Sequence, residues 1–117
     1  VYSSVGGDSG GGFANDDTNA LTIYSPSNTP TSSSGFTATW AYFVNTYGTS
    51  GDLRMNGVSK TTGDTGTTAY NGMTVNRHRS GSTYGDTIFG ELFVYTSALS
   101  SANITSLETY LSDKWGF

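Results

Sequence analysis

Residues 35 to 58 decide the fold class; they read G-F-T-A-T-W-A-Y-F-V-N-T-Y-G-T-S-G-D-L-R-M-N-G-V. Up to residue 47, larger apolar side chains alternate with small or polar ones, and Trp40, Tyr42 and Val44 fall on the same face. A period of two residues is typical of a strand with one buried face. We therefore expect a strand here, with Trp40 packed in the core.

A second strand is predicted directly after the first. Beyond a turn bounded by glycines, Leu53 and Met55 fall on one face and Arg54 on the other. The pair Asn56-Gly57 then favours a tight turn, because both residue types tolerate a positive φ. The whole stretch therefore predicts an antiparallel hairpin.

The composition of the 117-residue chain agrees with an all-β domain. It contains 16 Gly and 36 Ser and Thr, yet 14% of its residues are aromatic, which is typical of short strands joined by tight turns. The net charge is −4 with only five Lys and Arg, so we expect no nucleic-acid partner. No apolar run approaches the roughly 20 residues of a membrane span. Cysteine is absent, which excludes disulfides and thiolate metal sites.

Further strands are predicted on both sides of the hairpin. Residues 20 to 25 and 73 to 79 alternate in the same way, whereas residues 87 to 95 (T-I-F-G-E-L-F-V-Y) are apolar on both faces. A strand of the second kind is expected at the centre of a sheet that is covered on both sides. Residues 59 to 70 are polar and interrupted by glycine, which predicts a loop.

The two ends of the chain differ from its middle. Residues 1 to 19 are rich in Gly, Ser and Asp and predict an arm or loop ahead of one domain over residues 20 to 117. The start at Val1 rather than Met indicates a processed product or a fragment. After residue 100, apolar side chains recur every three or four positions, which predicts a helix of about 14 residues. Ser100 or Ser101 is the expected N-cap, and Gly116 the expected stop.

The C-terminal third resembles a known family. F-G-E-L-F-V-Y at residues 89 to 95, A-L-S at 98 to 100, and Y-L-x-x-K-W-G at 110 to 116 resemble the end of laminin-G-like, concanavalin A-like jelly-roll domains. L-R-M-N-G-V at residues 53 to 58 is similar to a strand end of the same family, and the resemblance covers roughly residues 36 to 117. It implies an antiparallel jelly-roll sandwich with a short C-terminal helix and with Trp115 in the core.

The resemblance also carries expectations about function. Members of the family mostly bind glycans or proteins, and many sit in phage, viral or bacterial surface proteins. They usually carry several strands ahead of the Asn-Gly hairpin, where this chain has only a short glycine-rich part. The sandwich is therefore abridged, or a second chain completes it, which predicts a homo-oligomer or larger assembly.

These observations predict a non-enzymatic surface module for glycan binding or adhesion, extracellular or on a virion. The alternative is a purely structural decoration or filament subunit that packs against copies of itself or a partner chain. A third interpretation, an accessory domain of a glycan-active enzyme, requires sequence upstream of Val1. Glycosidases need two carboxylates across a cleft, but Glu91 and Glu108 lie far apart in sequence, and Glu91 is structural in the family motif.

The best ligand candidates are tyrosines beside turn-forming residues, because aromatic faces stack on the C–H surfaces of sugars: Tyr47, Tyr70 and Tyr84. The alternative for each is packing at the edge of a turn. Arg77 and Arg79 share a strand face and are candidates for contact with an anion or the carboxylate of an acidic sugar, with His78 between them as a surface residue.

Calcium is the one cofactor candidate. Its ligands would be the densest cluster of oxygen-bearing side chains, Asp8, Asp16, Asp17 and Asn19. Calcium takes six to eight oxygen ligands, and laminin-G-like folds often hold one calcium at a loop rim. The alternative is a solvated turn whose Asp and Asn side chains bond their own backbone.

Overall fold

The computed structural model describes residues 2–3, 11–15, 21–24, 40–67 and 88–117, which form two antiparallel sheets and one C-terminal helix. The first sheet has the order β1-β2-β3, with β1 at Tyr2–Ser3, β2 at Gly11–Asn15 and β3 at Leu21–Tyr24. The second has the order β4-β5-β6, with β4 at Phe43–Thr46, β5 at Gly51–Met55 and β6 at Val58–Gly63. The helix α1 spans Ser101–Trp115.

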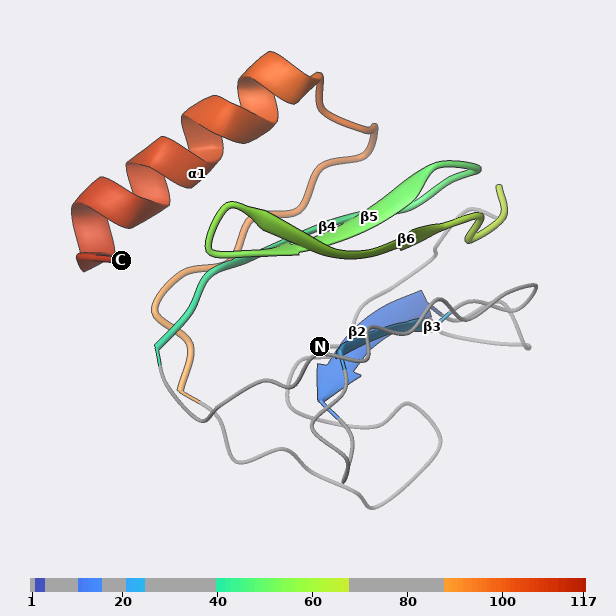
Figure 1. Ribbon diagram of the computed structural model, residues 1–117, viewed down its shortest axis with the longest axis horizontal. Helices are drawn as coiled ribbons and strands as arrows, with labels where there is room; N and C mark the ends of the chain where they lie inside the picture. The colour runs from blue at the N-terminus through green and yellow to red at the C-terminus, as the bar shows by residue number, and fades with distance from the viewer. Residues whose placement is uncertain (1, 4–10, 16–20, 25–39, 68–87) are drawn as a thin grey trace.

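The second sheet lies between the helix and the first sheet. In Figure 1, α1 lies along one side of β4-β5-β6, and β2 and β3 lie on the other side, where β3 comes close to β5 and β6. The expectation of antiparallel sheets with one C-terminal helix is thus confirmed. Within residues 1 to 19, expected to be an arm or loop, β1 and β2 form backbone pairs.

The predicted hairpin forms between β4 and β5, where Phe43 pairs with Met55 and Thr46 with Asp52, although residues 40–42 lie outside the first strand. The predicted Asn56-Gly57 turn also forms, and it joins β5 to β6. Met55 pairs with Val58 across a two-residue turn in which Asn56 has φ 48° and Gly57 has φ 77°. Positive φ at both central residues is the backbone that matches the twist of the flanking strands. The turn therefore fixes the register between β5 and β6, with one irregularity between Leu53 and Arg54.

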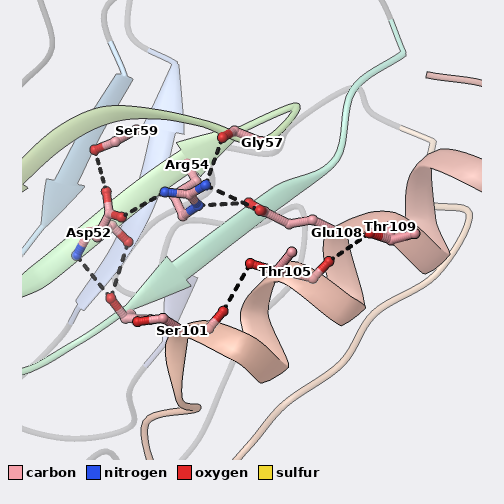
Figure 2. Close-up of polar contacts among 9 residues, drawn as sticks. Asp52, Arg54, Gly57, Ser59, Ser101, Thr105, Glu108 and Thr109 are labelled. Atoms are coloured by element: carbon pink, nitrogen blue, oxygen red, sulfur yellow. Dashed lines mark hydrogen bonds and ion pairs between the residues drawn. The ribbon is translucent and has the colours of Figure 1, made fainter.

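The faces of β5 separate a small core from a polar contact. Leu53 is fully buried, with Phe43, Tyr47 and Met55 packed around it. On the opposite face, Val44 pairs with Arg54. The Arg54 side chain reaches the helix from this face, as Figure 2 shows. The sheet thus presents an apolar surface on one side and a charged contact on the other.

Three sequence predictions are wrong at the level of elements and burial. Residues 59 to 63 belong to β6 rather than to a loop, because pairing with β5 through the tight turn continues past the turn itself. Trp40 is 57% exposed and is not a core residue. Trp115 is 42% exposed, although the family resemblance implied that it is buried.

The largest departure concerns residues 88–95, called the apolar segment below. These residues form no strand, and the side chains of Ile88, Leu92 and Val94 are 79%, 46% and 66% exposed. The prediction of a central strand covered on both faces is therefore wrong. An apolar run becomes a strand only where a neighbouring backbone pairs with it, and no backbone hydrogen bond joins this segment to another described part of the chain.

Candidate functional site

The candidate site lies where the helix meets the second sheet, and an ion pair between Arg54 and Glu108 positions it. The Nε of Arg54 donates to Oε1 of Glu108 at 2.7 Å, and its Nη2 donates to Oε2 at 3.2 Å (Figure 2). The Glu108 residue is 7% exposed, so this two-point contact neutralises a nearly buried carboxylate.

Neighbours of Arg54 on the sheet hold its guanidinium in place. Its Nη2 also donates to the carbonyl of Gly57 at 2.6 Å, and its Nη1 lies 3.5 Å from Oδ2 of Asp52. Asp52 in turn accepts a hydrogen bond from Ser59 Oγ at 2.6 Å. The hydrogen bond to Glu108 is the main cause that raises the pKa of Arg54, while burial acts in the opposite direction. The group stays charged and links β5, the hairpin turn and α1.

An open pocket of about 310 Å³ adjoins this ion pair. Its lining consists of one aromatic residue from the chain just before β4 and a polar stripe of the helix: Tyr42, Thr105, Glu108, Thr109, Ser112 and Asp113. The helical members recur at spacings of three and four, so they share one face of α1.

Tyr42 supplies the aromatic wall of the pocket. Its backbone exchanges hydrogen bonds with Asn56, because Tyr42 N–H donates to Asn56 Oδ1 at 3.0 Å and Asn56 N–H donates to the Tyr42 carbonyl at 3.1 Å. Burial raises the pKa of the Tyr42 hydroxyl, and the negative charge of Glu108 raises it further. The hydroxyl therefore remains protonated at neutral pH and is able to donate a hydrogen bond.

The hydroxyl groups of the helix supply hydrogen-bond acceptors to the pocket. Thr105 Oγ1 donates to the Ser101 carbonyl at 3.0 Å, Thr109 Oγ1 donates to the Thr105 carbonyl at 3.0 Å, and Ser112 Oγ donates to the Phe117 carbonyl at 2.6 Å. Since each hydroxyl hydrogen is already donated within the chain, these oxygens can act only as hydrogen-bond acceptors toward a ligand. A partner of this surface should therefore carry hydrogen-bond donors.

A second cluster joins the apolar segment to the helix; we call Gly90, Glu91, Tyr110, Lys114 and Trp115 the tail cluster. Both Glu91 oxygens accept from Lys114 Nζ at 3.1 Å, and Oε1 also accepts from the Tyr110 hydroxyl at 3.0 Å. A Cβ added at Gly90 would lie 2.9 Å from the Trp115 ring, so a larger residue there would displace the ring. The motif residues behind the family resemblance thus contact one another.

Most of the predicted site residues lie outside the described residues. Among the ligand candidates these are Tyr70, Tyr84, Arg77 and Arg79, and among the calcium ligands they are all four, Asp8, Asp16, Asp17 and Asn19. Tyr47 is described: it packs against Leu53, and its hydroxyl accepts from Asn45 Nδ2 at 2.6 Å. It lies on the face of the sheet away from the pocket, and its role in ligand binding stays a prediction.

Calcium binding likewise stays a prediction. Within the described ranges, no group of three or more His, Cys, Asp or Glu side chains is arranged to hold a metal ion.

No helix in the described part of the chain has the length and hydrophobicity that crossing a bilayer requires.

The sequence reading missed the pocket residues and the partner of Arg54. The signal for the pocket was present as a polar stripe at helical spacing, from Thr105 to Asp113, beside the apolar stripe of the helix. Nothing in the sequence indicated that Arg54 pairs with Glu108, because this pairing depends on how the helix docks.

Comparison with protein-family models, with curated proteins and with solved structures gave no match to this chain.

Proposed function

We propose that this chain is a non-enzymatic surface module and that the open pocket between α1 and the start of β4 binds a neutral saccharide. The observation that carries the proposal is the lining of the pocket, which combines the Tyr42 ring with a row of acceptor oxygens. Sugars present apolar C–H faces and many hydroxyl donors, and such a lining matches both.

The charges of the pocket favour neutral rather than acidic sugars. Its lining contains the carboxylates of Glu108 and Asp113, and Arg54, the cation that contacts this lining among the described residues, is already bonded to Glu108. A sugar carboxylate placed here would face like charges without a cationic partner of its own. This inference differs from the expectation that Arg77 and Arg79 contact an acidic sugar, and the two are separable by experiment.

The absence of catalysis is part of the same proposal. A glycosidase needs one carboxyl group as acid and a second as base or nucleophile. Both oxygens of Glu108 are bonded to Arg54, so this carboxylate belongs to the contact between sheet and helix. The pocket is therefore better suited to holding a sugar than to cleaving it.

The proposal includes a fold and a location. We place the two sheets in an abridged laminin-G-like sandwich displayed on a cell, appendage or virion surface. Support for the fold comes from the position of β3 against β5 and β6 and from the mutual contacts of the tail cluster.

A glycan array that contains neutral and acidic oligosaccharides, followed by calorimetry on each hit, tests the proposal. We expect binding to neutral glycans, with an affinity at least tenfold weaker in Tyr42→Ala and in Asp113→Ala. The matched control is Trp40→Ala, which removes an exposed aromatic residue outside the pocket lining. The proposal fails if the array shows no neutral ligand, or if Tyr42→Ala, checked for folding by circular dichroism, binds as the wild type does.

One observation favours the second candidate function, a structural subunit that packs against copies of itself. The apolar segment exposes six large apolar side chains in eight residues, which a solitary monomer rarely leaves in water. This surface is separate from the pocket lining, so both functions are compatible with one chain.

A further inference from the structure

We infer that the apolar segment, residues 88–95, joins two copies of this chain by antiparallel strand pairing across a two-fold axis. The inference rests on the second candidate function and names its partner and its mode of contact. It does not depend on the saccharide pocket, because none of the pocket residues belongs to the segment.

The first argument concerns the backbone of the segment. Its residues lie in neither helix nor strand, and no backbone hydrogen bond links them to another described part of the chain. Ile, Phe, Val and Tyr, which make up most of the segment, are enriched in strands. An exposed run of this kind is a template for pairing with another strand.

The second argument concerns area. Ile88, Val94 and Tyr95 are more than half exposed, and Phe89, Leu92 and Phe93 are 40%, 46% and 40% exposed. A fully buried aromatic side chain removes roughly 150–250 Å² from water, so the exposed parts of these three aromatic and three aliphatic residues together offer several hundred Å². This is on the order of the ~800 Å² that each partner contributes to a stable interface.

The chemistry of the segment favours a second copy of itself over the sheet edge at β6. That edge carries Lys60 and a run of Thr and Ser, which would place polar groups against apolar side chains. A second apolar segment offers matching apolar surface. A two-fold axis is the commonest symmetry of homo-oligomers and brings the same patch of each copy together.

The one charge in the segment does not oppose such a contact. An antiparallel pair centred on the segment has its midpoint between Glu91 and Leu92, so the two Glu91 residues come near each other. Each Glu91 carboxylate already accepts from Lys114 at 3.1 Å and from Tyr110 at 3.0 Å within its own chain. Two neutralised carboxylates meet there rather than two free charges, although the chain as a whole carries −4.

Analytical ultracentrifugation of the full chain from low to high micromolar concentration tests the inference. We expect the wild type to form a dimer, and we expect Leu92→Lys and Val94→Pro to weaken it at least tenfold. Leu92→Lys places a charge in the interface, and Val94→Pro removes a backbone donor and blocks pairing. The matched control is Val58→Lys, an exposed apolar position of β6 outside the segment, which should leave the dimer unchanged.

Hydrogen exchange distinguishes protection of the segment by a second copy from protection by other parts of the same chain. We expect the amides of residues 91–95 to exchange fast in dilute monomer and to become protected as the dimer forms. The inference is overturned by a monomer at every concentration, by a dimer that all three variants retain, or by protection already present in the monomer. Since Leu92 and Val94 are exposed, both variants should fold, and their circular dichroism checks this. If the wild type stayed monomeric at every concentration but bound a saccharide, the inference would fail while the proposed function stood.

Discussion

At the scale of single residues, the half-buried Glu91 is the centre of the tail cluster. It accepts hydrogen bonds from Lys114 and Tyr110, and the indole nitrogen of Trp115 lies 3.4 Å from its Oε2. Lys114 Nζ also lies over the rings of Tyr110 and Trp115, at 5.2 and 5.6 Å from their centroids. Partial burial raises the pKa of Glu91, but the hydrogen bonds from these three side chains outweigh it and hold the pKa below its ordinary value of 4.5.

This shift predicts how the tail cluster responds to acid. Because the pKa of Glu91 is lower in the folded state, its contribution to stability is present above the unfolded-state pKa and is lost as the pH falls through the folded-state pKa. An NMR titration of the Glu91 side-chain carboxyl should therefore have its midpoint below 4.5 in the wild type. Lys114→Met should raise the midpoint, whereas Lys60→Met, a charge removed far along the chain, should not. A wild-type midpoint at or above 4.5 would contradict the geometry of the cluster.

At the scale of elements, the ends of α1 are defined by two residues. Ser100 has φ −64° and ψ 156°, and its Oγ accepts from the Asn103 N–H at 3.2 Å. Gly116 adopts φ 76°, and its N–H donates to the Ser112 carbonyl at 2.8 Å. These caps satisfy backbone groups that the helix leaves without partners. They also explain why the predicted helix was confirmed with its expected N-cap and stop.

The N-cap makes a measurable prediction. Ser100→Ala removes the acceptor for Asn103 N–H and should lower the free energy of unfolding by about 1 kcal/mol. Urea denaturation followed by circular dichroism measures the change. Ser101→Ala is the matched control, because alanine is a good helix former in the first turn and should cost little or nothing. Equal stability of Ser100→Ala and wild type would show that the cap is not used in solution.

At the scale of the whole molecule, the Arg54–Glu108 pair ties together segments that are 54 residues apart in the chain. Arg54 comes from the hairpin and Glu108 from the helix, and the side chain of Glu108 is only 9% exposed. Removing one partner of a buried ion pair leaves the other charge without compensation. The attachment of α1 to the sheet therefore depends strongly on this contact.

Arg54→Ala tests that dependence. We expect it to lower the free energy of unfolding by about 2–3 kcal/mol, less than for a fully buried pair because the Arg54 side chain is 25% exposed. The stability of Arg54→Lys should lie between that of Arg54→Ala and that of the wild type, since a lysine keeps the charge but cannot reproduce the two-point contact. Thermal and urea unfolding measure the effect. If Arg54→Ala were as stable as the wild type, the contact would contribute nothing to the docking of the helix.

What the sequence predicted well was local. The Asn56-Gly57 turn and the helix with its caps follow from the conformational preferences of a few neighbouring residues. β6 was missed because its polar residues alternate weakly and depend on pairing with β5. The apolar segment was wrongly predicted to be a strand. Its residue pattern indicates only a preference for strand structure, which is realised when a neighbouring backbone pairs with it, and no described part of the chain does so.

The candidate site shows the same division. Its helical face was readable from the spacing of Thr105, Glu108 and Thr109, but its aromatic wall comes from Tyr42, far away in the sequence. Which face of α1 meets the sheet is fixed by the ion pair with Arg54, a tertiary contact that no local pattern encodes. The loop tyrosines and arginines chosen from the sequence stay predictions, as does calcium.

The short connections between β4, β5 and β6, the Asn56-Gly57 turn among them, also indicate the order in which the parts of the molecule fold. The strands β4, β5 and β6 follow one another along the chain and pair with their immediate neighbours, so each pairing closes only a short loop. Docking of α1 through Arg54 and Glu108 closes a much longer one, at a higher entropic cost. During synthesis or refolding, we therefore expect the hairpin to form first. Arg54 remains solvated until α1 has formed and docks through Glu108.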